Sequence, residues 1–269
     1  MKRANVDGIS LEYEAQGSGD PVVLIHGSHI ADTFATLMAE PALRDHFNLI
    51  RYHRRGFAGS SRADATLPIS RQAADCLGLL RQLGIQRAHL VGHSYGGAIA
   101  LQLALDAPEA VRSLSLLEPA LFDVPSFVQL SEQIERTAQI YEAGDKAGAV
   151  DAFLEAVCGR EYRAALDRRL PGAFEQAVTD AGTFFDVELP ALGEWTFSRE
   201  DAARINHPVL GVLGADSDAV WPGWGESHRL SLEWLPQAKP FVLPRAAHLL
   251  QVENPHDMAQ GLAAFLANN

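Results

Sequence analysis

The chain reads AHLVGHSYGGAIAL from residue 88 to residue 101, and this stretch carries the strongest structural signal in the sequence. Residues 88–91 predict a buried strand and residues 95–105 an apolar helix. Between them Gly92 and Gly96 flank Ser94 in the pattern Gly-x-Ser-x-Gly, and a strained serine turn needs such small neighbours. The turn directs the Ser94 hydroxyl outward at a helix N-terminus, where the helix dipole favours developing negative charge. Ser94 is therefore predicted to be a nucleophile.

Strand and helix signals alternate on both sides of this turn. Residues 21–25 and 208–213 are continuous apolar runs, typical of strands buried on both faces. Further elements are predicted as strands at 48–52, 111–117 and 239–243, helices at 70–83 and 255–266, and a hairpin at 3–15. This alternation predicts an α/β fold with a mostly parallel twisted sheet flanked by helices.

The alternation stops between residues 121 and 204. Residues 126–143 and 147–157 predict helices, and no segment of this stretch has a convincing strand pattern. We expect residues 121–204 to form a helical cap over the carboxyl ends of the strands, where open α/β sheets bind ligands. Residues 1–120 and 205–269 would then form the core. The alternative is that these helices pack on one side of the sheet.

Composition limits the class of protein. The chain has 22 Lys and Arg against 34 Asp and Glu, a net charge of −12, which disfavours nucleic acid and anionic membrane surfaces as partners. There is no membrane-length apolar run and no secretory signal pattern, and Cys76 and Cys158 lack metal or redox spacing, so we expect a cytoplasmic protein. Ten histidines occur without a recognised metal spacing, and we expect neither metal nor cofactor.

Several motifs occur in an order that is known from one superfamily. They are His26-Gly27, RRGFAGS at 54–60, the serine turn, GADSDAVWP at 214–222, Ala247-His248 and Glu253-Asn254-Pro255. Over nearly its whole length the chain resembles the α/β-hydrolase superfamily, many members of which carry a helical cap. The resemblance implies a serine nucleophile, an acid after a late strand and a histidine after the last strand. His53 departs from it, since many relatives have an aspartate there, but that residue usually organises a loop.

A serine nucleophile needs a base, and His248 is the candidate because it follows the last predicted strand. Three carboxylates compete to be the acid that orients the imidazole. Asp218 is preferred because it stands four residues before Pro222, the spacing usual in the family. Asp216 lies nearer the strand end, and Glu118 ends an earlier strand, where some members of the superfamily carry the acid.

The tetrahedral intermediate of acyl transfer needs backbone N–H donors. We assign these to Tyr95, which follows the nucleophile, and to Ser28, in the loop after His26-Gly27. His29 and Trp195 are candidates for contacts with substrate.

The function expected from these features is hydrolysis of a small, largely apolar carboxylic ester or lactone through an acyl-enzyme. Serine as nucleophile argues against the relatives that use aspartate. A carbon–carbon bond hydrolase is disfavoured because Leu249 follows the histidine where such enzymes usually have tryptophan. A lyase, a perhydrolase and a ligand-binding receptor with little turnover all stay open, because each can keep the same three residues.

Overall fold

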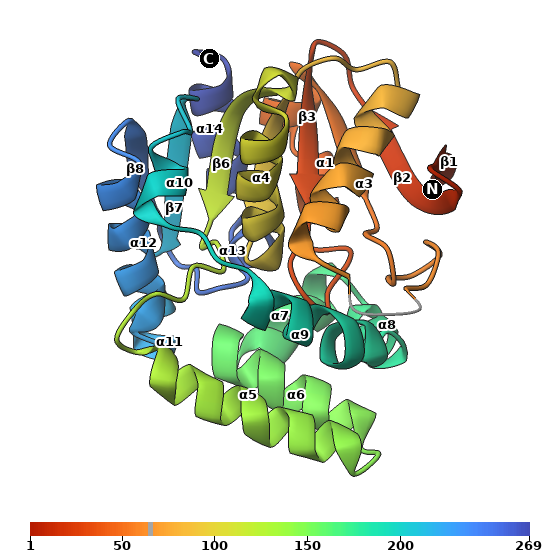
Figure 1. Ribbon diagram of the computed structural model, residues 1–269, viewed down its shortest axis with the longest axis vertical. Coiled ribbons are helices and arrows are strands. Elements are labelled where there is room, and N and C mark those ends of the chain that lie inside the picture. Colours follow the sequence, from red (N-terminus) through yellow and green to blue (C-terminus); the bar gives the residue numbers. More distant parts are fainter. Residues whose placement is uncertain (64–66) are drawn as a thin grey trace.

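The strands pair in the order β1-β2-β4-β3-β5-β6-β7-β8 in a computed structural model that describes residues 1–63 and 67–269 (Figure 1). Their bounds are β1 Lys2–Val6, β2 Ile9–Gln16, β3 Asp20–Ile25, β4 Phe47–Tyr52, β5 Ala88–His93, β6 Val111–Leu117, β7 Val209–Gly214 and β8 Ala238–Leu243. β1 and β2 run antiparallel to their neighbours, and the strands from β4 to β8 in this order are parallel. The predicted fold class is therefore confirmed.

Helices cover both faces of this sheet because its strands are apolar on both sides. On β3, Val23 and Ile25 pack with α3 and α4, whereas Val22 and Leu24 pack with α1, α2 and α14. This two-residue period is the side-chain alternation of a strand. The helices outside residues 121–204 are α1 Ala35–Met38, α2 Pro41–Arg44, α3 Ile69–Gln82, α4 Tyr95–Asp106, η1 Pro108–Ala110, α11 Ser217–Val220, α12 Gly223–Trp234, α13 Leu250–Glu253 and α14 Pro255–Leu266.

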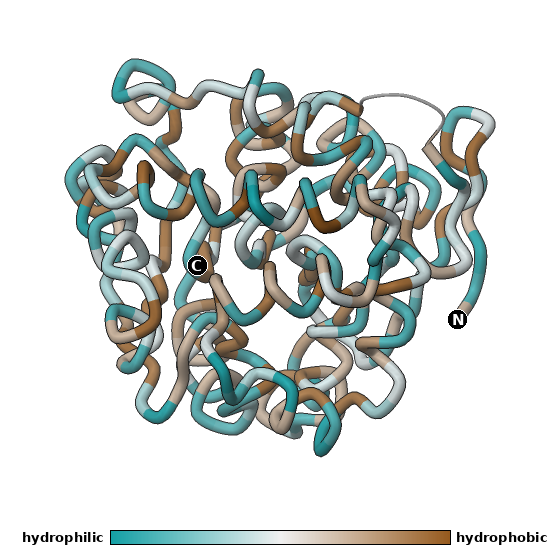
Figure 2. Tube along the Cα trace, turned by 90° about the horizontal axis from the view of Figure 1, so that it is seen from below, coloured by the Kyte–Doolittle hydropathy of each residue, from teal (hydrophilic) through white to brown (hydrophobic). Residues whose placement is uncertain are grey.

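Local turn and cap signals agree with these bounds. Asp7 and Gly8 have φ angles of 48° and 87°, the backbone that a two-residue hairpin turn requires, and they join β1 to β2. Asn254 caps α14 by accepting a hydrogen bond from the Asp257 N–H, with Pro255 at the first helical position. In Figure 2 hydrophobic and hydrophilic residues alternate along much of the trace, as amphipathic elements around a core require.

Residues 121–204 are all described by the structure, and they contain helices but no strand. The elements are α5 Phe127–Glu142, α6 Lys146–Cys158, α7 Tyr162–Arg169, α8 Ala173–Thr179, the π-helix η2 Thr183–Glu188, α9 Leu189–Glu194 and α10 Arg199–Ala202. We call residues 121–204 the helical insertion. Its helices α5 to α9 lie beyond the carboxyl ends of β3 and β6 (Figure 1). That the insertion is a separate domain stays a prediction.

The helical insertion shares one hydrophobic cluster with loops that follow the strands and with the start of α12. Leu154 and Phe184 of the insertion pack there with Ile30, Trp224 and Leu249. The contact is apolar, so burial of this surface holds the insertion against the sheet. Within residues 1–63 and 67–269, no helix is long and apolar enough to cross a membrane.

Candidate active site

Ser94 lies between β5 and α4 in a strained backbone conformation, with φ 52° and ψ −119°. Its N–H donates to Leu117 O at 3.0 Å, and its carbonyl accepts from Gly97 N and Ala120 N. A Cβ atom at Gly92 would collide with the Gly96 carbonyl, so only glycine fits this turn. The turn predicted around Ser94 is therefore present, and the ends of two neighbouring strands hold it in place.

Ser94 opens into a narrow cavity under the helical insertion. The cavity has a volume of about 40 Å³ and is mainly apolar. Its walls include Ser28, Ile30, Thr33, His93, Tyr95, Phe122, Leu130, Ile134, Phe153, Leu154, Phe184, Leu189, Leu192, Trp224, His248 and Leu249. Ser94 and His248, which the sequence places 154 residues apart, thus face the same space.

The carboxylate beside His248 belongs to Glu118. His248 Nδ1 lies 2.6 Å from Glu118 Oε2, and both side chains are buried. Glu118 Oε1 accepts hydrogen bonds from Gly214 N at 2.7 Å and from Ser217 Oγ at 2.5 Å. Both carboxylate oxygens therefore have partners, and the acceptor at Oε2 fixes the imidazole with its proton on Nδ1 and Nε2 free to act as a base.

The prediction that Asp218 pairs with His248 is wrong. Asp218 is exposed, and its Oδ1 accepts a hydrogen bond from Gly225 N at 2.7 Å at the start of α12. Asp216 is exposed as well. In the short helix α11 it is Ser217 that points inward, to Glu118. Adjacent residues of a helix point in different directions, so Asp218, one residue after Ser217, faces away from His248. The spacing from Pro222 contains no information on this rotation, and it therefore indicated the wrong carboxylate.

Two further rings hold the imidazole of His248. Trp224 stacks on it, with ring centroids 3.7 Å apart and planes 12° from parallel. His93 Nε2 donates to the backbone carbonyl of His248 at 2.8 Å. His93, adjacent to Ser94, thus supports the loop that carries His248. Nothing in the sequence spacing pointed to Trp224.

Burial dominates the electrostatics of the pair formed by Glu118 and His248. It raises the pKa of Glu118, which the hydrogen bonds from Ser217 and Gly214 oppose in part, and it lowers the pKa of His248. The imidazole is therefore held neutral, the form that can take a proton. Desolvation also lowers the pKa of His93 to about 3, so this neighbouring ring adds no positive charge.

Ser28 and Tyr95 both line the cavity beside Ser94. Within residues 1–63 and 67–269, neither backbone N–H donates a hydrogen bond to another protein group. Tyr95 is the first residue of α4, where an N–H has no partner inside the helix. Both donors are thus free for a ligand atom.

Neither of the two residues expected to contact substrate lines the cavity beside Ser94. His29 is buried behind the cavity wall with its ring against Phe153, Phe184 and Phe185, at centroid distances of 4.4 to 5.6 Å. Trp195 lines an adjacent cavity of about 380 Å³ and donates its indole N–H to Gln102 Oε1. The sequence reasoning missed Thr33, which lines the cavity beside Ser94 and whose buried hydroxyl has no partner among the described residues.

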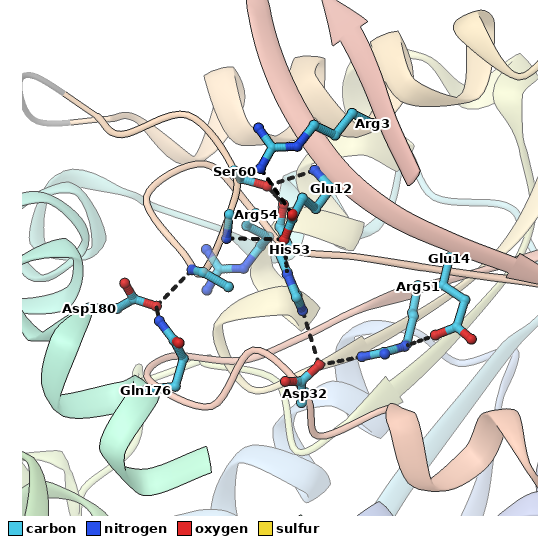
Figure 3. Close-up of polar contacts among 12 residues, drawn as sticks. Arg3, Glu12, Glu14, Asp32, Arg51, His53, Arg54, Ser60, Gln176 and Asp180 are labelled. Carbon is cyan, nitrogen blue, oxygen red and sulfur yellow. Dashed lines mark hydrogen bonds and ion pairs between the residues drawn. The ribbon is translucent and has the colours of Figure 1, made fainter. Parts of the chain in front are cut away.

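His53 bridges two carboxylates at the position where many relatives have an aspartate. Its Nδ1 lies 3.2 Å from Glu12 Oε2 and its Nε2 lies 3.0 Å from Asp32 Oδ1 (Figure 3). His53 thus connects strand β2, through Glu12, with the loop that carries Asp32. Among the described residues, no group of three or more His, Cys, Asp or Glu is arranged to hold a metal ion.

Comparison with known proteins identifies the family of this fold. Residues 20–255 match the family model of the alpha/beta hydrolase fold. The chain is 31% identical to the putative carbamate hydrolase RutD of Klebsiella pneumoniae (strain 342), over 92% of this chain and 93% of that protein. The chain therefore belongs to the α/β-hydrolase family.

Two other similarities are more limited. The chain is 36% identical to the dihydrolipoyllysine-residue acetyltransferase component of the acetoin cleaving system of Cupriavidus necator, over 94% of this chain. It spans only 66% of the length of that relative. The enol-lactonase from Burkholderia xenovorans LB400 superposes with a TM-score of 0.84 over 99% of this chain and 100% of that chain, at 22% identity, which shows the shared fold.

Proposed function

We propose that this protein is a carboxylic ester hydrolase that forms an acyl-enzyme on Ser94, with His248 as base and Glu118 as the acid that orients it. The observation that carries the proposal is the 2.6 Å contact between His248 Nδ1 and Glu118, made beside the strained Ser94 turn. A serine, a histidine and a buried carboxylate with these contacts fill the three roles of a catalytic triad.

In the proposed reaction, Ser94 Oγ attacks the ester carbonyl while His248 Nε2 takes the hydroxyl proton. The negative oxygen of the intermediate accepts hydrogen bonds from the N–H groups of Ser28 and Tyr95. The intermediate collapses, and His248 gives the proton to the departing alcohol. Water then attacks the acyl group, His248 takes and returns its proton in the same way, and the carboxylic acid leaves Ser94 free. Glu118 stabilises the imidazolium in both halves.

The size and polarity of the cavity support a small, largely apolar acyl group. A volume of about 40 Å³ holds on the order of three water-sized groups, which favours a short acyl chain beside Ser94. The Thr33 hydroxyl offers one polar contact in this apolar space. The larger neighbouring cavity shares Phe122 and Leu192 with it, which leaves room for a bulkier apolar alcohol or for the ring of a lactone.

The test is covalent labelling by a fluorophosphonate, read by intact mass, together with turnover of p-nitrophenyl acetate, butyrate and octanoate. We expect a single label on Ser94, and a preference for the two shorter esters. Ser94→Ala should remove the label and lower turnover by about 10⁴-fold or more. A label that persists in the alanine variant would exclude Ser94 as nucleophile. A chain that is neither labelled nor active would instead favour a ligand-binding receptor on the same fold.

A further inference from the structure

Arg54 is a buried cation at the base of the site, on the loop that follows β4. Its guanidinium donates to His26 O at 3.0 Å and to Gly27 O at 2.8 Å, the two carbonyls that precede Ser28. Its backbone N–H donates to His26 Nε2 at 3.0 Å. Three hydrogen bonds from one residue therefore fix the segment that carries the Ser28 N–H.

Arg54 also contacts the second proposed oxyanion donor residue. Its guanidinium carbon lies 4.9 Å from the centre of the Tyr95 ring, which favours a cation–π contact. Gln72 accepts from Arg54 Nη1 at 2.5 Å and donates from Nε2 to the Tyr95 hydroxyl at 3.1 Å. One cation thus supports both segments that supply N–H groups to the cavity.

The partner that neutralises Arg54 comes from the helical insertion. Glu188, the last residue of η2, is fully buried and forms an ion pair with Arg54 Nη1. Burial raises the pKa of Glu188, and the Arg54 charge opposes that rise. A buried ion pair is not needed for stability alone, since apolar residues of similar volume often serve as well, whereas loss of one partner leaves an uncompensated charge.

We infer that Glu188 is a positioning residue that acts through Arg54 to hold the Ser28 and Tyr95 N–H groups in the geometry of an oxyanion hole, an inference that rests on the function proposed above. The ion pair between Arg54 and Glu188 then couples the position of the helical insertion to the stabilisation of the transition state. When Glu188 is absent, Arg54 loses the contact that sets its direction, and the His26-Gly27 carbonyls lose their fixed donors. The Ser28 N–H drifts from the oxyanion, while the apolar cavity that binds the substrate keeps its walls.

The experiment compares Glu188→Gln with the double variant Arg54→Met/Glu188→Leu, which removes the ion pair but refills its volume with apolar groups. Fluorophosphonate labelling measures the concentration of folded, active protein in the preparation of each variant. We expect both variants to lower kcat on p-nitrophenyl butyrate by roughly 10-fold to 100-fold, because misplaced oxyanion donors act in the transition state. KM should change by less than about threefold. The inhibition constant of butylboronic acid, which forms a tetrahedral adduct on the serine, should rise by the same factor as kcat falls.

Asp180→Asn is the matched control. Asp180 also links the insertion to the core, through Arg62 Nη1 at 2.6 Å and the Ala58 N–H at 2.7 Å, but it does not touch the His26-Gly27 carbonyls. Its kcat and boronic acid affinity should stay near those of the wild type. If the double variant regains a wild-type kcat together with its stability, the pair is merely structural and the inference is wrong. The same conclusion follows if Asp180→Asn lowers kcat as much as Glu188→Gln. If the wild-type chain itself takes no fluorophosphonate label, the proposed function is wrong. This result differs from the two outcomes above, which concern only the role of the ion pair.

Discussion

Trp224 lies flat on the imidazole of His248, with centroids 3.7 Å apart and planes at 12°. Its indole N–H donates to Val157 O, in α6 of the helical insertion, at 3.1 Å. The ring is fully buried, so its direction is set by packing on one side and by this hydrogen bond on the other. The imidazole of His248 is thus held by a carboxylate at its edge and by an aromatic ring on its face, and the aromatic contact joins it to the insertion.

We predict that Trp224→Phe keeps most of the activity, because a flat ring still covers the imidazole. Trp224→Ala should lose about 3–5 kcal/mol of unfolding free energy, as large buried aromatic residues do, and should also lower kcat of the folded fraction. Urea unfolding and label-corrected kcat measure the two effects. Trp221→Ala is the control, because Trp221 packs edge-on against Trp224 at 4.9 Å. It should lose stability with little change in kcat, and an equal loss of kcat in both alanine variants would contradict an orienting role for Trp224.

The sequence predicted the fold well because its strongest signals are local. The serine turn, the hairpin at Asp7-Gly8 and the cap at Asn254 each need only neighbouring residues, and each is found where it was expected. His248 lines the cavity because it lies in the loop after β8, and the loops that follow parallel strands lie at the carboxyl ends of the sheet.

The acid and the supporting ring could not be predicted in this way. Glu118 follows β6 and Asp218 follows β7, and these strands are neighbours in the sheet, so the carboxyl ends of both offer a candidate carboxylate. The choice depends on whether Ser217 or Asp218 faces inward on α11, a rotation that no spacing rule fixes. Trp224 reaches His248 only through tertiary packing, and its position in the sequence carries no signal of this.

The buried His29 predicts how stability depends on pH. Desolvation lowers its pKa to about 3 from the usual 6.5, and its ring nitrogens have no partner among the described residues. Between these pH values the unfolded chain binds a proton that the folded chain does not, so unfolding becomes easier as the pH falls. The loss is about 1.4 kcal/mol per pH unit below pH 6.5 for this one group. His29→Phe should remove it, and denaturant titrations of both proteins at pH 7.0, 6.0 and 5.0 measure the difference. If the free energy of unfolding changes with pH by the same amount in the wild type and in His29→Phe, the explanation based on His29 is wrong.

His53, which stands where many relatives have an aspartate, gives a further test. His53 contributes to keeping the pKa of Asp32 below its ordinary value through their hydrogen bond, and it contacts Glu12 on the other side. His53→Asp restores the residue common in relatives but places three carboxylates together. We expect it to lower the free energy of unfolding by about 1–3 kcal/mol at pH 7, a range reduced because the Asp32 side chain is 38% exposed.

Asp32→Asn in the His53→Asp background should recover part of that loss, because it removes one of the repelling charges. The four chains of this double-mutant cycle, compared by urea unfolding, give the coupling energy directly. If His53→Asp is as stable as the wild type, the bridging contacts of His53 do not organise the loop.

In the proposed mechanism Glu118, and not Asp218, orients His248. The most direct measurement is kcat for p-nitrophenyl butyrate in Glu118→Gln and in Asp218→Asn. Each kcat is divided by the fraction of chains that carry a fluorophosphonate on Ser94 after an incubation long enough for labelling to reach completion. Glu118→Gln should lower kcat by roughly 10²–10⁴-fold at neutral pH, because the imidazole loses the acceptor that fixes its tautomer. Asp218→Asn, whose side chain contacts only the start of α12, should stay within about threefold of the wild type. A crippled Asp218→Asn beside a nearly wild-type Glu118→Gln would contradict the account.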